Sequence, residues 1–189
     1  MRHVVLMVAV VIAVSCGGGS EPVEQAAPAT SPPRASASFD PCSLMTREEV
    51  QAVVGWTVTQ TKPIPQGALG HCVYSGEGMT AEGPREVDLG IGVCFSNMPC
   101  GAGLPAFASS AELAAYRRKG YEGSTILGDL KPTIEPVEGL GVPAIRHELA
   151  GQKSVELGLG RERLAYVELW GSFDAALALA KQLLTRVPK

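Results

Sequence analysis

The chain has 189 residues, a formal net charge of −3 and an isoelectric point near 5.6. This length suffices for one ordinary domain with additional segments, and a domain of about 150 residues buries enough surface to fold without a metal. The acidic balance and an aromatic content of 5% argue against the clustered cations and stacking platforms that nucleic-acid binding requires. The one dense basic run, Arg117 to Lys119, is expected at a helix C-terminus, where the helix dipole favours cations.

The chain starts with a short basic segment, which an unbroken apolar run from Val4 to Val14 follows. A bilayer-spanning helix needs about 20 apolar residues, so this shorter run is typical of the hydrophobic region of a signal peptide. The next residues, Ala13-Val14-Ser15-Cys16, resemble the lipobox of bacterial lipoproteins. That resemblance implies a signal peptide over residues 1–15, cleavage before Cys16, and lipid on the Cys16 thiol. A plain secretory peptide that is cut elsewhere is the alternative.

Residues 16–38 are rich in Gly, Ala, Pro and Ser and have almost no large apolar side chain. Such a segment cannot bury enough surface to offset the entropy of ordering it, so we expect a disordered, lipid-anchored linker. Residues 39–189 then form a single domain. We expect an exported protein that is anchored by its lipid to the cell membrane or, in a cell with two membranes, to the outer membrane.

Four cysteines remain after Cys16, and an even number in an exported chain predicts two disulfides. Three pairings are possible, and we favour Cys42–Cys72 with Cys94–Cys100, because the second pair closes a short loop of turn-forming residues. A metal site is the alternative. It is disfavoured because the sequence has no CxxC motif, and because His71 and Cys72 would point to opposite faces of a strand.

The periodicity of the apolar residues predicts an α+β domain, with a mostly antiparallel sheet covered by about three helices. The helices are expected over 47–54, 109–119 and 174–187, with Thr46 and Glu49 as a capping box, Gly120 as a stop and Asp174 as a cap. Six short strands are expected over 56–61, 71–74, 85–95, 144–149, 154–159 and 163–170, the last two forming a hairpin across Gly160.

The segment Asp40-Pro41-Cys42-Ser43-Leu44-Met45-Thr46, with Glu49-Val50, Gly55 and Cys72-Val73-Tyr74, resembles the opening of the DUF3558-type family of small exported bacterial lipoproteins of unknown function. Residues 137–141, the hairpin and the final helix are similar to the C-terminal half of that family. The pair Cys94 and Cys100, and Pro143, depart from its pattern. The resemblance implies an exported, disulfide-linked α+β domain without known catalytic residues. Comparable lipoproteins adopt a Mog1/PsbP-like α/β sandwich, which the order of the elements fits.

No group of residues in the sequence predicts an active site, a metal site or a cofactor. His71 and His147 are isolated within expected strands, where a core or surface role is favoured, and no nucleophile-elbow motif occurs. Glu86 and Asp88 share a strand face and could flank a ligand, although a solvated sheet face explains them more simply. The Tyr74 to Gly78 segment superficially suggests a phosphate loop but lacks the following helix and lysine.

Two surfaces are candidates for binding: the loop from Asn97 to Ala108, which contains Leu104 and Phe107, and the wetter sheet face near Trp56 and Trp170. Ordinary packing is favoured for both. We expect a non-enzymatic binding or interaction module of the cell envelope, whose partners are the membrane, through its lipid, and an envelope protein. The alternatives are a carrier of an apolar small molecule or lipid and, least favoured, a hydrolase, which would need a cleft holding a His or a carboxylate with a shifted pKa.

Overall fold

A computed structural model of the chain describes residues 40–66, 69–92, 105–122, 130–160 and 163–187. These residues belong to the second of two compact units, which spans 36–189 and contains its own apolar core. Its elements are, in chain order, a 3-10 turn η1 (Pro41–Leu44), α1 (Arg47–Val54), β1 (Gln60–Gln66), β2 (Leu69–Met79), β3 (Pro84–Gly92), α2 (Ser110–Glu122), β4 (Thr133–Val137), β5 (Ala144–Leu149), β6 (Gln152–Gly160), β7 (Arg163–Trp170) and α3 (Phe173–Leu184).

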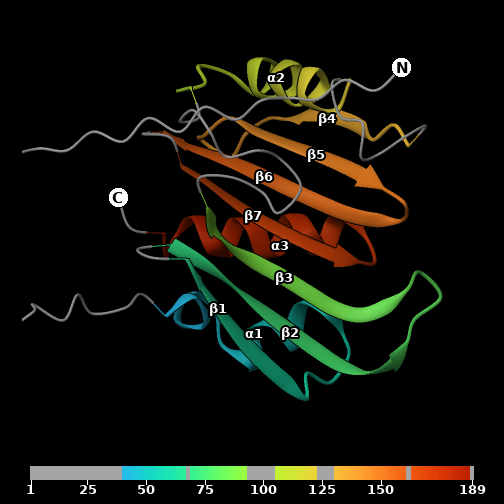
Figure 1. Ribbon diagram of the computed structural model, residues 1–189. Helices are drawn as coiled ribbons and strands as arrows, with labels where there is room; N and C mark the ends of the chain where they lie inside the picture. The colour runs from blue at the N-terminus through green and yellow to red at the C-terminus, as the bar shows by residue number, and fades with distance from the viewer. Residues whose placement is uncertain (1–39, 67–68, 93–104, 123–129, 161–162, 188–189) are drawn as a thin grey trace, which may run out of the picture. The chain divides into compact units, whose positions relative to one another are not determined.

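The strands form one seven-stranded sheet in the order β1-β2-β3-β7-β6-β5-β4 (Figure 1). Every neighbouring pair is antiparallel, and β7 joins the two halves of the sheet by pairing with both β3 and β6. The expected α+β class, an antiparallel sheet covered by three helices, is therefore confirmed. The described residues contain no helix that is both long and apolar enough to cross a membrane.

One face of the sheet packs against η1, α1 and α3, and we call it the α3 face. Side chains alternate between the two faces along a strand, which places Val87 and Leu89 of β3 and Val155 and Leu157 of β6 on this side. All four are buried in the main core, together with Leu179 and Leu183 of α3. The apolar stripe of the last helix therefore covers the sheet, as its sequence predicts.

The opposite face, which we call the α2 face, is covered by α2 over β4 and β5. A second, smaller apolar cluster fills this contact and consists of Leu113, Ala114, Ile134, Ile145 and Leu164. Polar and ionisable side chains occupy much of the remainder of this face, including Asp88, Tyr166, Glu168 and Glu156. The α2 face is therefore where the chemistry of the domain is concentrated.

The sequence prediction for the first helix is confirmed in detail. The backbone N–H of Glu49 donates to the Thr46 hydroxyl, and the Glu49 carboxylate accepts from the N–H of Thr46 in return. Gly55 ends the helix at φ 74°, a left-handed conformation that glycine adopts without strain. Met45 and Val50 are both buried, as a hydrophobic staple requires.

The strand predictions were wrong at the edges of the sheet. The first strand was expected over 56–61, whereas β1 runs from Gln60 to Gln66, and β2 continues to Met79, so that residues 74–78 are part of a strand. The structure also adds β4 to the six predicted strands. Both β1 and β4 contain proline. An edge strand tolerates proline because its outer side has no neighbouring strand to which an N–H group would have to donate.

The predictions for the last two helices were right in position but wrong at the ends. Helix α2 passes through Gly120 and extends to Glu122. The cap of α3 is Ser172 rather than Asp174, since the Ser172 hydroxyl accepts from the N–H of Ala175, and the helix ends at Leu184. The expected hairpin between β6 and β7 is confirmed, with Gly160 opposite Arg163.

Candidate functional site on the α2 face

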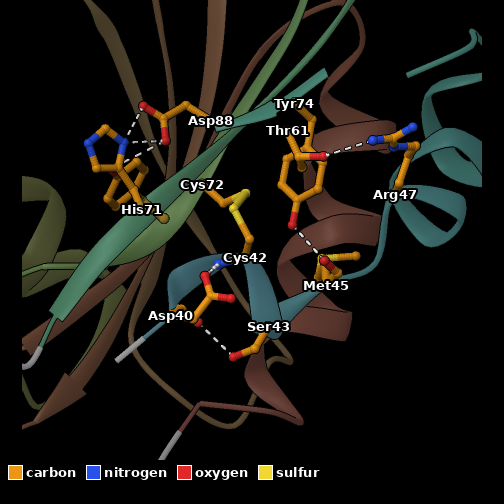
Figure 2. Close-up of a disulfide and its surroundings, with 11 residues drawn as sticks. Asp40, Cys42, Ser43, Met45, Arg47, Thr61, His71, Cys72, Tyr74 and Asp88 are labelled. Carbon is orange, nitrogen blue, oxygen red and sulfur yellow. Dashed lines mark hydrogen bonds and ion pairs between the residues drawn. A yellow bond between two sulfur atoms is a disulfide. The ribbon is translucent and has the colours of Figure 1, made fainter. Parts of the chain in front are cut away.

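The predicted disulfide between Cys42 and Cys72 is present and joins η1 to β2 (Figure 2). It fixes the start of the domain to the sheet, and Tyr74 on the same strand reinforces this connection by donating a hydrogen bond to the Met45 carbonyl at 2.6 Å. Cys16 and the predicted Cys94–Cys100 pair lie outside the described residues. The known disulfide therefore lies on the α3 side of β2, where it shapes the scaffold rather than the polar face.

His71, the neighbour of Cys72 on β2, points to the opposite face and meets Asp88 of β3 (Figure 2). Its Nδ1 lies 2.6 Å from Oδ1 and 2.8 Å from Oδ2 of Asp88. The side chains are 16% and 21% exposed, so the pair is largely but not fully withdrawn from water. Among the described residues Nε2 of His71 has no hydrogen-bond partner. A carboxylate thus orients an imidazole whose other nitrogen is available to a ligand.

Gly90 makes this pairing possible because it lies directly opposite His71 in the register of β2 and β3. A Cβ at position 90 would lie 2.5 Å from the His71 Cβ and 2.6 Å from the Gly70 carbonyl oxygen, closer than such atoms can approach. The glycine therefore accommodates the close approach of His71 to β3, and any larger residue would displace it.

Asp88 faces a second carboxylate, Glu168, directly across the β3–β7 pair. Burial raises the pKa of Asp88, although the hydrogen bond from His71 opposes this effect. Burial, and then repulsion by Asp88, raise the pKa of Glu168 to about 7. The Tyr166 hydroxyl lies 3.5 Å from Asp88 Oδ1, a long contact. Because these two carboxylates lie on neighbouring strands, the negative charge of one makes ionisation of the other less favourable at neutral pH.

Further along the same face, Glu156 of β6 is buried between two cationic or potentially cationic groups. Its Oε2 lies 2.5 Å from Nε of Arg117 on α2, and its Oε1 lies 2.8 Å from Nε2 of His147 on β5. Glu156 is 1% exposed. Burial raises the pKa of this carboxyl, but Arg117 and His147 together outweigh that effect and leave the pKa below its usual value. The group therefore stays ionised and connects α2 to the sheet.

The α2 face also carries a serine next to its ionisable side chains. The serine that the register places beside Glu168 and His147 is Ser154, and its side chain is buried, which shields the hydroxyl from a substrate. No group of three or more His, Cys, Asp or Glu side chains among the described residues could hold a metal ion. What the face offers is His71, Asp88 and Glu168, partly exposed and held by three adjacent strands.

Sequence analysis identified some members of this site but not their roles. The structure brings His71 and Asp88 together, whereas Glu86 is exposed and acts on the pair through charge repulsion that raises the pKa of Asp88. Arg117 was expected only as part of a basic run at a helix C-terminus, whereas its side chain is 2% exposed and pairs with Glu156. Sequence analysis missed Glu156 and Glu168. Each of them alternates with apolar residues along its strand, β6 or β7, and this alternation places the glutamate on the face opposite those apolar residues.

The two surfaces proposed from the sequence are only partly described. Residues 93–104, and with them Asn97 and Leu104, lie outside the described residues, while Phe107 packs against the second core cluster. A Cβ at Gly83 would lie 2.5 Å from the ring of Trp170, and one at Gly76 would lie 2.7 Å from the ring of Trp56. The Trp56 indole therefore packs closely on the backbone of β2, and the Trp170 indole packs closely on the turn between β2 and β3.

Three surface cavities that described residues line lie outside this polar site. One of about 280 Å³ opens between the end of α2 and the start of β4. Two others, of about 210 and 150 Å³, adjoin Arg146 and Phe173 on the α3 side. The charged side chains near these last two pair with one another, Arg146 with Glu135 and Lys153 with Glu148.

Comparison of the chain with protein-family models, with curated proteins and with solved structures found no match. The resemblance to the DUF3558-type family, and the Mog1/PsbP-like arrangement that it implies, therefore remain predictions from the residues quoted above.

Proposed function

We propose that the chain is an exported lipoprotein, held at a membrane surface through lipid on Cys16, whose domain is a non-enzymatic binding module of the cell envelope. Support for the location comes from the short apolar leader, the lipobox-like Ala13 to Cys16 segment and the linker after it. The resemblance to exported lipoproteins agrees with this location. Two or three acyl chains would anchor the protein stably, since each buried CH₂ contributes about 0.8 kcal/mol.

The observation that carries the binding role is the position of His71, Asp88 and Glu168 on three adjacent strands. Strand-borne side chains are held more rigidly than loop-borne ones, which favours recognition of a fixed partner surface. His71 contacts the Asp88 carboxylate through Nδ1, which leaves its Nε2 available for a hydrogen bond to a partner. An envelope protein that donates and accepts hydrogen bonds at this face is the partner that such a surface suits.

Chemical cross-linking in intact membranes tests both parts of this proposal. We expect the wild-type chain to remain in the membrane fraction and to form a cross-linked species, and Cys16→Ser to release the chain. Asp88→Asn should abolish the cross-linked species without releasing the chain. The matched control is Glu82→Gln in the β2–β3 turn, an exposed carboxylate that should leave the cross-link unchanged. Equal cross-linking by Asp88→Asn and wild type would contradict the binding role of this face.

A further inference from the structure

The largest of the three cavities lies away from the polar site, at the C-terminal end of α2. Tyr121 of α2 and Ile134 of β4 form part of its wall, and Leu130 and Pro132, which precede β4, add further apolar surface. Leu130 is 54% exposed, one of the few large apolar side chains on the described surface. A volume of about 280 Å³ is near the lower limit for small-molecule pockets.

Among the described residues that line the cavity, two cations, Arg118 and Lys131, border this apolar wall, against one carboxylate, Glu122. One terminal nitrogen of Arg118, Nη2, donates to the Ile134 carbonyl at 2.7 Å, which fixes the guanidinium at the edge of the cavity. Among the described residues its other two nitrogens have no hydrogen-bond partner, and Lys131 is exposed. A pre-positioned guanidinium with free donors is a favourable partner for an anionic oxygen.

We propose that this cavity binds a single-chain amphiphile that carries one anionic group, with the anion between Arg118 and Lys131 and the chain over Leu130 and Tyr121. The charge balance of the lining selects an anionic over a cationic head. The exposed Leu130 selects a ligand with an apolar body, because an inorganic anion would leave that side chain in water. This inference is independent of the binding role of the His71–Asp88 face, since the two sites share no residue.

The test uses the unit spanning residues 36–189, which contains every described element and its own core. The probe is 1-anilinonaphthalene-8-sulfonate, an anionic amphiphile whose fluorescence rises on binding. Decanoate, decanol and inorganic phosphate are each added as competitors. We expect saturable probe binding that decanoate displaces, and much weaker displacement by decanol or phosphate. Lys131→Glu should weaken binding about fivefold, because it reverses one partly solvated charge contact.

Two variants separate this site from non-specific binding. Lys131→Arg keeps the charge and should bind as wild type does, and Lys62→Glu, an equivalent exposed charge reversal on β1, should also leave binding unchanged. Near-ultraviolet circular dichroism checks that every variant retains its packing. Absence of saturable binding, equal displacement by decanol and decanoate, displacement by phosphate alone, or equal weakening by Lys62→Glu would each overturn the proposal.

Discussion

Arg117 on α2 and Glu156 on β6 form an ion pair with a nitrogen–oxygen distance of 2.5 Å, while neither side chain is more than 2% exposed. His147 adds a second contact to the same carboxylate. Together with a small apolar cluster and the hydrogen bonds of Ser110 and Arg118 to the backbone of β4, this charged contact positions the helix on the sheet. A buried pair of this kind specifies geometry more than it adds net stability.

Removal of one partner from this pair is therefore costly. We expect Glu156→Gln to lower the free energy of unfolding by about 3 kcal/mol, because the buried Arg117 would lose its ion pair with this carboxylate. Urea denaturation followed by circular dichroism measures this change. The control is Glu135→Gln, which breaks a half-exposed pair with Arg146 and should cost less than about 1 kcal/mol. Equal costs for the two variants would contradict the importance of the buried pair.

Glu168 should make the domain less stable as pH rises. Its pKa is raised from 4.5 to about 7 in the folded state. Between these values the folded state keeps a proton that the unfolded state has lost, so the free energy of unfolding falls as pH increases through this range. Glu168→Gln cannot ionise and should remove this slope, gaining up to about 3 kcal/mol over wild type between pH 4.5 and pH 8.

Urea titrations of wild type and Glu168→Gln at intervals from pH 4.5 to pH 8 measure this difference. Glu122→Gln, at an exposed carboxylate at the end of α2, is the control and should keep the wild-type slope. Parallel pH profiles for wild type and Glu168→Gln would show that the folded environment does not retain that proton.

The disulfide between Cys42 and Cys72 closes a loop with a sequence separation of 30. A cross-link of that length restricts the unfolded chain enough to contribute about 3–4 kcal/mol. The double variant Cys42→Ser with Cys72→Ser should lose this amount while it retains the wild-type circular dichroism spectrum at low temperature. Thermal unfolding with and without reductant gives the same comparison in the wild type, and an unchanged midpoint after reduction would contradict it.

Much of the scaffold could be predicted from the sequence because local signals coincide with the final packing. The capping box of Thr46 and Glu49, and the alternation of Val87, Leu89 and Ile91, depend on neighbours within a few residues. Strand β4 could not be predicted in this way, since its five residues include Pro136 and are too few to show a strand period before β5 supplies hydrogen-bond partners. Edge strands owe their existence to tertiary pairing more than to propensity.

Most of the polar site could not be predicted from the sequence either, because it too depends on tertiary pairing. Glu156 meets Arg117 across 39 positions of sequence, and Tyr166 meets Asp88 across 78. A single sequence carries no signal for such pairings, whereas the strand register determines them at once. The basic run at Arg117 also had a sufficient local explanation, the helix dipole, and its burial under α2 depends on contacts that only the fold creates.

Prolines at both ends of the sheet should keep it from pairing with a second copy. Pro63 and Pro65 lie on β1 and Pro136 lies on β4, the two outermost strands. Each withholds an N–H that an added strand would need. We expect Pro63→Val with Pro65→Val to promote self-association, measured by size-exclusion chromatography with light scattering. Pro84→Val, at the start of the central strand β3, is the control and should leave the mass unchanged.

The central claim, that lipid on Cys16 tethers this domain to a membrane, is tested most directly by mass spectrometry of the mature N-terminal peptide. The account predicts a peptide that begins at Cys16 and carries the added mass of a diacylglyceryl group. A peptide that still contains residues 1–15, or one with an unmodified Cys16, would contradict it.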